Sequence, residues 1–244
     1  MNILASGWKT SDFLPGQSWL RYNYETDSSY VYVNIPKNAS SWAKENFGGY
    51  EYNFITQTFV GTPTSAVTIK RARNVEPTYV VILRDPLDRW LSGAAQSFYG
   101  CSPDSPYFFM NIHNDMMFQH MVFDNHTAPQ TMFLQGINQA KTVWFKCNDN
   151  LTYQLDAWMQ ECFNDTVSPV VRNNKNSYNV SAYGVGNEFL ARDNKTKIIG
   201  WSQQEIIDEL KNRLEQNPKY KQLIRDFYTD DYALYESVKF YDPR

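Results

Sequence analysis

A short loop between a strand-like and a helix-like stretch carries residue types that suit anion binding. Within residues 30–47, alternating β-branched residues precede Pro36, which cannot pair inside a sheet. Ser40 and Ser41 follow at positions where a helix N-cap is expected. The unpaired amides and the positive end of a helix dipole favour an anion, and Lys37 adds a positive charge there. The sequence therefore predicts a phosphate-binding loop, with a solvated turn as the alternative interpretation.

A second junction of the same kind places an arginine and a serine near a strand end. Residues 79–83 form a continuous apolar run typical of a buried parallel strand, and Arg84 follows it directly. Pro86 then begins a helix in which Ser92 lies two turns along, off the apolar stripe. Open α/β sheets bind ligands at the carboxyl ends of their strands, and a guanidinium with a hydroxyl suits a phosphate monoester. The alternative is an Arg84–Asp88 ion pair beside a solvent-facing serine.

Together, these two loops resemble those of the sulfotransferases that use 3′-phosphoadenosine 5′-phosphosulfate (PAPS). The order Pro-Lys-x-small-Ser/Thr-Ser/Thr-aromatic, which begins at Pro36, resembles their 5′-phosphosulfate loop, whereas a Walker A loop places its glycines first and its Lys-Ser/Thr pair last. Arg-Asp-Pro-Leu-Asp-Arg-Trp-Leu-Ser-Gly resembles their 3′-phosphate motif, in which the first arginine and the serine hold that phosphate. The resemblance implies that the cofactor, and its product 3′-phosphoadenosine 5′-phosphate, are bound by Lys37, Asn38, Ala39, Ser40, Ser41, Trp42, Arg84 and Ser92.

A third block supplies a candidate base. The pattern Asp124-x-His126-x-x-Pro129-Gln130 resembles a block in the carbohydrate O-sulfotransferases that act on chondroitin and the HNK-1 glycan. The resemblance implies that His126 accepts the proton of an acceptor hydroxyl and that Lys37 stabilises charge on the bridging oxygen. The implied partner is a carbohydrate or a small glycan-like molecule. Without that resemblance, His126 would be read as an N-cap or packing residue.

The distribution of apolar residues predicts an α/β fold. At 244 residues, with 42% hydrophobic and 16% aromatic residues, we expect one domain over 1–244 with a central parallel sheet flanked by helices. The resemblance implies a three-layer fold like that of the P-loop NTPases, with a helical C-terminus. The expected strands are 31–35, 52–60, 79–83 and 142–146. The expected helices begin near 41 and span 86–100, 114–123, 151–163, 203–216, 219–227 and 230–238. Residues 1–29 are expected to form an irregular cover, and 169–200 a long loop that binds the acceptor or closes as a lid.

Composition excludes several classes of partner. A net charge of −3 gives no general attraction to nucleic acid or to an anionic membrane. No apolar run reaches the roughly 18 residues of a membrane span, and the N-terminal residues lack a signal-peptide pattern. Three cysteines without a Cys-x-x-Cys pair suit neither disulfides nor zinc, and no metal site is expected. We therefore expect a cytoplasmic enzyme, for which a bacterial or viral origin is plausible.

Two other functions remain open at this point. A nucleotide-dependent kinase could use the same phosphate loop for ATP, although the missing Gly-Lys-Ser/Thr order argues against it. A non-catalytic nucleotide-binding protein could share the fold. The presence of Lys37, Arg84, Ser92 and His126 argues against that second function, because a degenerate copy is expected to have lost at least one of them.

Overall fold

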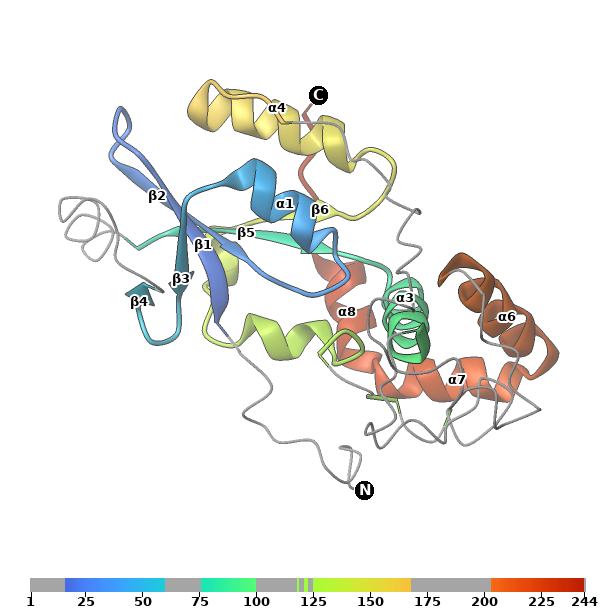
Figure 1. Ribbon diagram of the computed structural model, residues 1–244. Helices are drawn as coiled ribbons and strands as arrows, with labels where there is room; N and C mark the ends of the chain where they lie inside the picture. The colour runs from blue at the N-terminus through green and yellow to red at the C-terminus, as the bar shows by residue number, and fades with distance from the viewer. Residues whose placement is uncertain are drawn as a thin grey trace, which may run out of the picture. The chain divides into compact units, whose positions relative to one another are not determined.

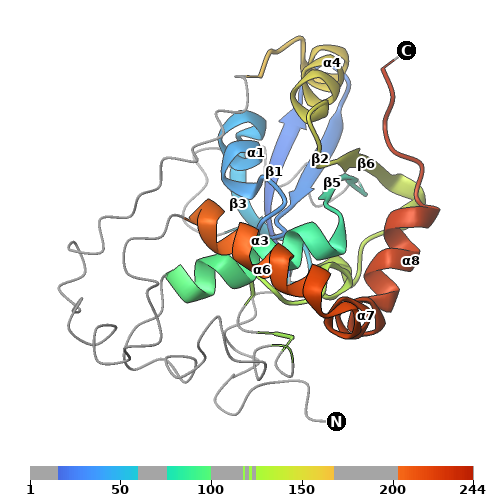
Figure 2. The same ribbon diagram turned by 90° about the vertical axis from the view of Figure 1, so that its right-hand side faces the viewer.

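The chain has an α/β architecture (Figures 1 and 2). The computed structural model describes residues 16–59, 76–99, 118, 121–122, 125–167 and 203–243. The predicted loop region 169–200 lies outside these residues. The chain divides into two compact units: the sheet unit comprises Leu14–Asp85, Pro129–Val170 and Asp230–Arg244, and the helical unit comprises Met1–Phe13, Pro86–Ala128 and Val171–Thr229. A single domain over 1–244 stays a prediction.

The sheet unit contains a six-stranded mixed sheet in the order β4-β3-β1-β2-β5-β6 (Figure 1). Its strands are β1 (Gln17–Asn23), β2 (Ser28–Val33), β3 (Tyr50–Asn53), β4 (Thr58–Phe59), β5 (Thr78–Leu83) and β6 (Thr142–Lys146). The neighbours β2, β5 and β6 run parallel, whereas β1, β3 and β4 pair antiparallel. The predicted parallel neighbours β2 and β5 are confirmed, but β2 ends at Val33 and the sheet as a whole is mixed.

Strand β1 corrects the prediction of an irregular segment over 1–29 for residues 17–23, while residues 1–15 lie outside the described part of the chain. It lies between two partners, since Trp19 is opposite Tyr32 of β2 and opposite Glu51 of β3. Ser18, Trp19 and Leu20 are all buried, so this part of β1 has no exposed face. The sequence therefore lacks the alternation of polar and apolar residues that marks a half-exposed strand. The buried Ser18 hydroxyl donates to the Tyr52 carbonyl at 2.5 Å, which satisfies it inside the sheet.

A turn also replaces part of the strand predicted over residues 52–60. The side-chain oxygen of Asn53 accepts from the backbone N–H groups of Ile55 and Thr56, both at 3.0 Å. Gln57 then adopts a left-handed conformation with φ 54°. Local bonds of this type let an asparagine stop a strand, so β3 and β4 form a hairpin instead of one continuous strand.

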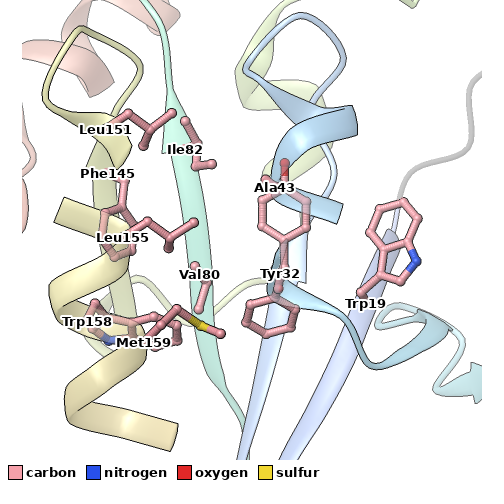
Figure 3. Close-up of a cluster of buried hydrophobic side chains, with 11 residues drawn as sticks. Trp19, Tyr32, Ala43, Val80, Ile82, Phe145, Leu151, Leu155, Trp158 and Met159 are labelled. Carbon is pink, nitrogen blue, oxygen red and sulfur yellow. The ribbon is translucent and has the colours of Figure 1, made fainter. Parts of the chain in front are cut away.

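Helices α1 (Ser40–Phe47) and α4 (Leu151–Phe163) cover the same face of the sheet (Figure 1). Figure 3 shows Leu155 of α4 beside Val80 of β5, in a cluster that also contains Tyr32 of β2 and Phe145 of β6. Phe47 of α1 stacks against Trp158 of α4, with ring centroids 6.4 Å apart. This core fixes α1, and with it the loop that precedes α1, against the sheet.

Tyr30 links this core to the alkaline stability of the fold. Burial, and then the nearby Cys162, raise the pKa of Tyr30 from 10.0 to about 12. A folded-state pKa above the unfolded one means that the stabilisation is present below about pH 10 and is lost as pH rises toward 12. We expect the urea-unfolding free energy of the wild type to fall over this range. Tyr30→Phe is expected to reduce the fall, whereas Tyr153→Phe at a side chain 65% exposed is not. Parallel pH profiles for the wild type and Tyr30→Phe would contradict this account.

The C-terminal part of the chain covers the outer edge of β6. After α8 (Thr229–Ser237), Phe240 pairs in parallel with Trp144, and the Tyr241 N–H donates to the Trp144 carbonyl at 2.7 Å. The Gln154 side chain of α4 donates to the Tyr241 carbonyl at 2.9 Å. An otherwise open sheet edge is thereby paired.

The helical unit packs α3 (Pro86–Tyr99), α6 (Gln203–Gln216) and α7 (Pro218–Phe227) together, and Figure 2 shows α3 and α6 side by side. Phe118 stacks on Trp90 of α3 at 6.0 Å and on Tyr220 of α7 at 4.2 Å between ring centroids. The helix predicted over 114–123 lies mostly outside the described residues. The other predicted helices are confirmed to within a residue or two, as is the helical C-terminal part of the chain. Among the described helices, none is long and apolar enough to cross a membrane.

Candidate phosphate-binding site

The loop between β2 and α1 turns through two left-handed residues. Lys37 has φ 69° and Ala39 has φ 57°, and they flank Asn38. Ala39 is the N-cap of α1, and no side chain caps the helix there. Ser40 and Ser41 are the first helical residues, so their prediction as N-caps is wrong. A loop with left-handed residues before a helix can form a concave nest of N–H groups that binds anions.

The left-handed conformation of Ala39 gives a stability prediction. In this conformation a residue with a Cβ is strained by about 1–2 kcal/mol, whereas glycine is hardly strained. Glycine also makes the unfolded chain more flexible, which offsets part of that advantage. We expect Ala39→Gly to leave the urea-unfolding free energy nearly unchanged. Ala39→Val should lower it by about 1–3 kcal/mol, because β-branching adds strain at positive φ. The control is Ala140→Val at an exposed position. An Ala39→Val variant as stable as this control would rule out the left-handed turn.

Asn38 holds the loop from below. Asn38 is completely buried, and its side-chain nitrogen donates to the Ile82 carbonyl at 2.7 Å and to Gln130 Oε1 at 2.6 Å. Its backbone N–H donates to the Ile35 carbonyl at 3.2 Å. These contacts make Asn38 a support of the loop, in contrast to its prediction as a cofactor contact. Asn38-Ala39-Ser40 also matches the Asn-x-Ser/Thr pattern of N-glycosylation, but the buried Asn38 side chain has no room for a glycan.

Arg84 meets this loop at the end of the neighbouring parallel strand. β5 ends at Leu83, and one guanidinium nitrogen of Arg84 donates to the Lys37 carbonyl at 3.1 Å. β2 and β5 are parallel, so both loops leave the sheet at its carboxyl edge. The structure therefore brings Lys37 and Arg84 together within the sheet unit, as the prediction requires.

Gln130 and Asp231 complete the site, although sequence reasoning gave neither a role. The Gln130 side chain accepts from the Arg84 N–H at 3.1 Å and donates to the Arg84 carbonyl at 2.9 Å. The Gln130 N–H donates to Asp231 Oδ2 at 2.7 Å. Both residues are 1% exposed. The sequence signal was present, because Gln130 ends the block that contains His126 and Asp231 lies in the C-terminal helical segment.

Trp42 and the two serines lie in the first turn of α1. It is partly buried against the core shared by α1 and α4. Ser40 is half-buried and Ser41 is exposed at the start of α1. Trp42 therefore packs against the core, and its predicted contact with the cofactor stays a prediction, as do those of the two serines.

Ser92 and His126 belong to the helical unit. Ser92 is 9% exposed, which corrects the prediction that it lies off the buried face of α3, and its carbonyl accepts from the Gln203 side chain at 3.2 Å. His126 is half-buried in a turn, with its Nε2 3.4 Å from Gln96 Nε2. Asp124, from the same block, lies outside the described residues.

The His126 turn is tied to α3. The buried Arg89 donates to the Ala128 carbonyl and, at 3.1 Å, to the Asn125 carbonyl, on either side of His126. A Cβ on Gly93 would stand 2.5 Å from the His126 carbonyl oxygen, so only glycine fits at that point of α3. The backbone of the turn is therefore fixed within the helical unit.

A hollow of about 620 Å³ lies in the sheet unit around the C-terminal end of α1, and it contains none of the predicted site residues. Arg21 lines it, donating to the Phe47 carbonyl at 3.0 Å and to Asp165 Oδ2 at 2.7 Å. The hydrogen bond from Arg21 holds the pKa of Asp165 below its usual range. Two of the charged side chains that line the hollow, Arg21 and Asp165, already pair with each other, so the loops at Lys37 and Arg84 stay the candidate site.

Within the described part of the chain, no group of three His, Cys, Asp or Glu side chains could hold a metal ion. Comparisons with protein-family models, with curated proteins and with solved structures found no match.

Proposed function

We propose that the chain is a sulfotransferase that moves a sulfuryl group from PAPS to a hydroxyl of a carbohydrate or small glycan-like acceptor. The observation that carries the proposal is the 3.1 Å hydrogen bond from Arg84 to the Lys37 carbonyl. This bond joins the two loops whose sequences resemble the 5′-phosphosulfate and 3′-phosphate loops of such enzymes. Both loops leave the same edge of parallel strands, where α/β sheets bind nucleotides.

The residues of the sheet unit suit a ligand with more than one anionic group. Lys37 and Ala39 give the loop the left-handed turns of an anion-binding nest, and the start of α1 adds unpaired amides. Arg84 contributes a guanidinium, which hydrogen-bonds phosphate oxygens in pairs. Lys37 and the N–H groups of its loop fit the phosphosulfate of PAPS, and the Arg84 guanidinium fits a second phosphate of the same ligand.

Each residue has one role in the proposed reaction. Bound PAPS supplies the activated sulfuryl group, which passes to the acceptor oxygen as its bond to the bridging oxygen breaks. Lys37 and the N–H groups of residues 39–41 stabilise the charge that develops at that oxygen. The sequence resemblance assigns the binding of the 3′-phosphate to Arg84 and Ser92. His126 accepts the proton that the acceptor hydroxyl loses, so the products are a sulfate ester and 3′-phosphoadenosine 5′-phosphate.

The test is transfer of label from the donor. We expect the purified chain, given PAPS with radioactive sulfur and a mixture of glycans and small metabolites, to produce a labelled acceptor without added magnesium. Lys37→Ala should lower the activity strongly, whereas Lys44→Ala, at an exposed position of the following helix α1, should retain it. Labelled phosphate passing from ATP only with magnesium would support the kinase instead. Nucleotide binding without any transfer would support the non-catalytic alternative.

A further inference from the structure

The side chain of Gln130 connects the two phosphate loops. Gln130 Oε1 accepts from Asn38 Nδ2 at 2.6 Å and from the Arg84 N–H at 3.1 Å. Gln130 Nε2 donates to the Arg84 carbonyl at 2.9 Å. A backbone N–H can only donate and a carbonyl can only accept, so the contacts with Arg84 fix the orientation of this amide. Gln130 thus pairs with Arg84 much as a neighbouring strand would, just beyond the end of β5.

Asp231 in turn fixes the backbone of Gln130. Its carboxylate accepts from the Gln130 N–H at 2.7 Å, from the Thr131 N–H at 3.0 Å and from the Thr131 hydroxyl at 2.9 Å. Asp231 is buried in α8, about a hundred residues along the chain from these donors. A buried carboxylate that accepts several hydrogen bonds is held in one position, and the groups bonded to it are held too. The start of the 3₁₀ helix Gln130–Leu134 therefore has a fixed place in the sheet unit.

We infer that Gln130 and Asp231 are positioning residues that set the spacing between the Lys37 loop and Arg84. Neither residue touches the ligand in this account, which rests on the proposed function. Asp231 holds Gln130, and Gln130 holds Asn38 beneath one loop and the Arg84 backbone in the other. A ligand that bridges both loops binds most tightly when the loops are already at the right distance, because binding then does not have to order them. A ligand that contacts one loop gains little from that spacing.

The test compares three variants with two controls. Gln130→Met keeps the length of the side chain but removes its hydrogen bonds, and Gln130→Glu removes the donor to the Arg84 carbonyl. Asp231→Asn removes one of the two acceptor oxygens. The controls are Gln135→Met, exposed after the same 3₁₀ helix, and Asp230→Asn, exposed beside Asp231. Circular dichroism and urea unfolding identify which variants are folded. Asp231→Asn and Gln130→Glu carry the test if Gln130→Met does not fold.

The first measurement is amide hydrogen exchange on the free protein. We expect faster exchange in residues 37–43 and 84–85 of the Gln130 and Asp231 variants, while exchange in α4 stays as in the wild type and in both controls. Unchanged exchange in both loops of the folded variants would overturn the inference. This measurement needs no ligand, so it decides the positioning role even if the wild type binds no nucleotide, an outcome that would instead refute the proposed function.

The second measurement is calorimetric titration with adenosine 3′,5′-bisphosphate and with AMP. We expect the ratio of their affinities to fall about tenfold or more in Gln130→Met and in Asp231→Asn. In an Arg84→Ala background, Gln130→Met should change that ratio less than about twofold. Gln130 acts on the 3′-phosphate only by positioning Arg84, so its effect is lost once the Arg84 side chain is removed. Equal weakening of both ligands, or an additive loss in the double variant, would show a general structural role and overturn the inference.

Discussion

Lys37→Ala is expected to lower turnover and donor affinity together. The lysine lies in the loop that would bind the phosphosulfate before the reaction, and the charge that it stabilises grows as the sulfuryl bond breaks. We expect kcat to fall by about 10²- to 10³-fold, with weaker binding of adenosine 3′,5′-bisphosphate as well. The measurements are steady-state rates with labelled PAPS and calorimetry with the bisphosphate. Lys37→Arg is informative beside it, because it keeps the charge and changes the geometry.

His126→Ala is expected to lower turnover without weakening donor binding, in contrast to Lys37→Ala. As a base for the acceptor hydroxyl, His126 should not affect donor binding. We expect the affinity for the bisphosphate to stay within about twofold of the wild type while kcat falls by about 10²- to 10⁴-fold. A His126→Ala variant with near wild-type turnover would assign the base to another residue and leave the His126 turn with a structural role.

Arg84→Ala is expected to remove most of the preference for a 3′-phosphate. A hydrogen bond between charged groups contributes about 1.5–3 kcal/mol, which is about 10- to 150-fold in affinity. We therefore expect the affinity for adenosine 3′,5′-bisphosphate to fall toward that for AMP, whose own affinity should change much less. Arg225→Ala, at an exposed position of α7, is the matched control. If Arg84→Ala weakened both nucleotides equally, Arg84 would be acting on the loop and not on the 3′-phosphate.

Helices could be predicted from the sequence because their apolar residues recur at helical spacing. The helix predicted over 151–163 has the same bounds as α4, and Leu155 and Trp158 lie in the core as its pattern requires. Strand β1 could not be predicted in this way, because a strand buried on both faces shows no alternation. The hairpin of β3 and β4 depends on the Asn53 side chain accepting backbone N–H groups, which an alternating pattern does not reveal.

The candidate site was predictable where it carries charge and a recognisable order of residues. Lys37 and Arg84 each follow an apolar run, and the structure brings them to one sheet edge. Gln130 and Asp231 were missed because a buried polar residue is defined by partners far away in the chain. The N-cap was misassigned for a related reason, since the conformation of Ala39 depends on how Asn38 is held beneath the loop.

The measurement that tests the central claim most directly is a calorimetric titration of the wild-type chain with adenosine 3′,5′-bisphosphate, AMP and ATP. A 3′-phosphate separates the cofactor of sulfuryl transfer from ordinary adenine nucleotides, and Arg84 lies in the motif that would bind it. The account predicts that the bisphosphate binds about tenfold or more tightly than AMP, with no need for magnesium. Equal affinity for the bisphosphate and AMP, or tighter binding of ATP with magnesium, would contradict it.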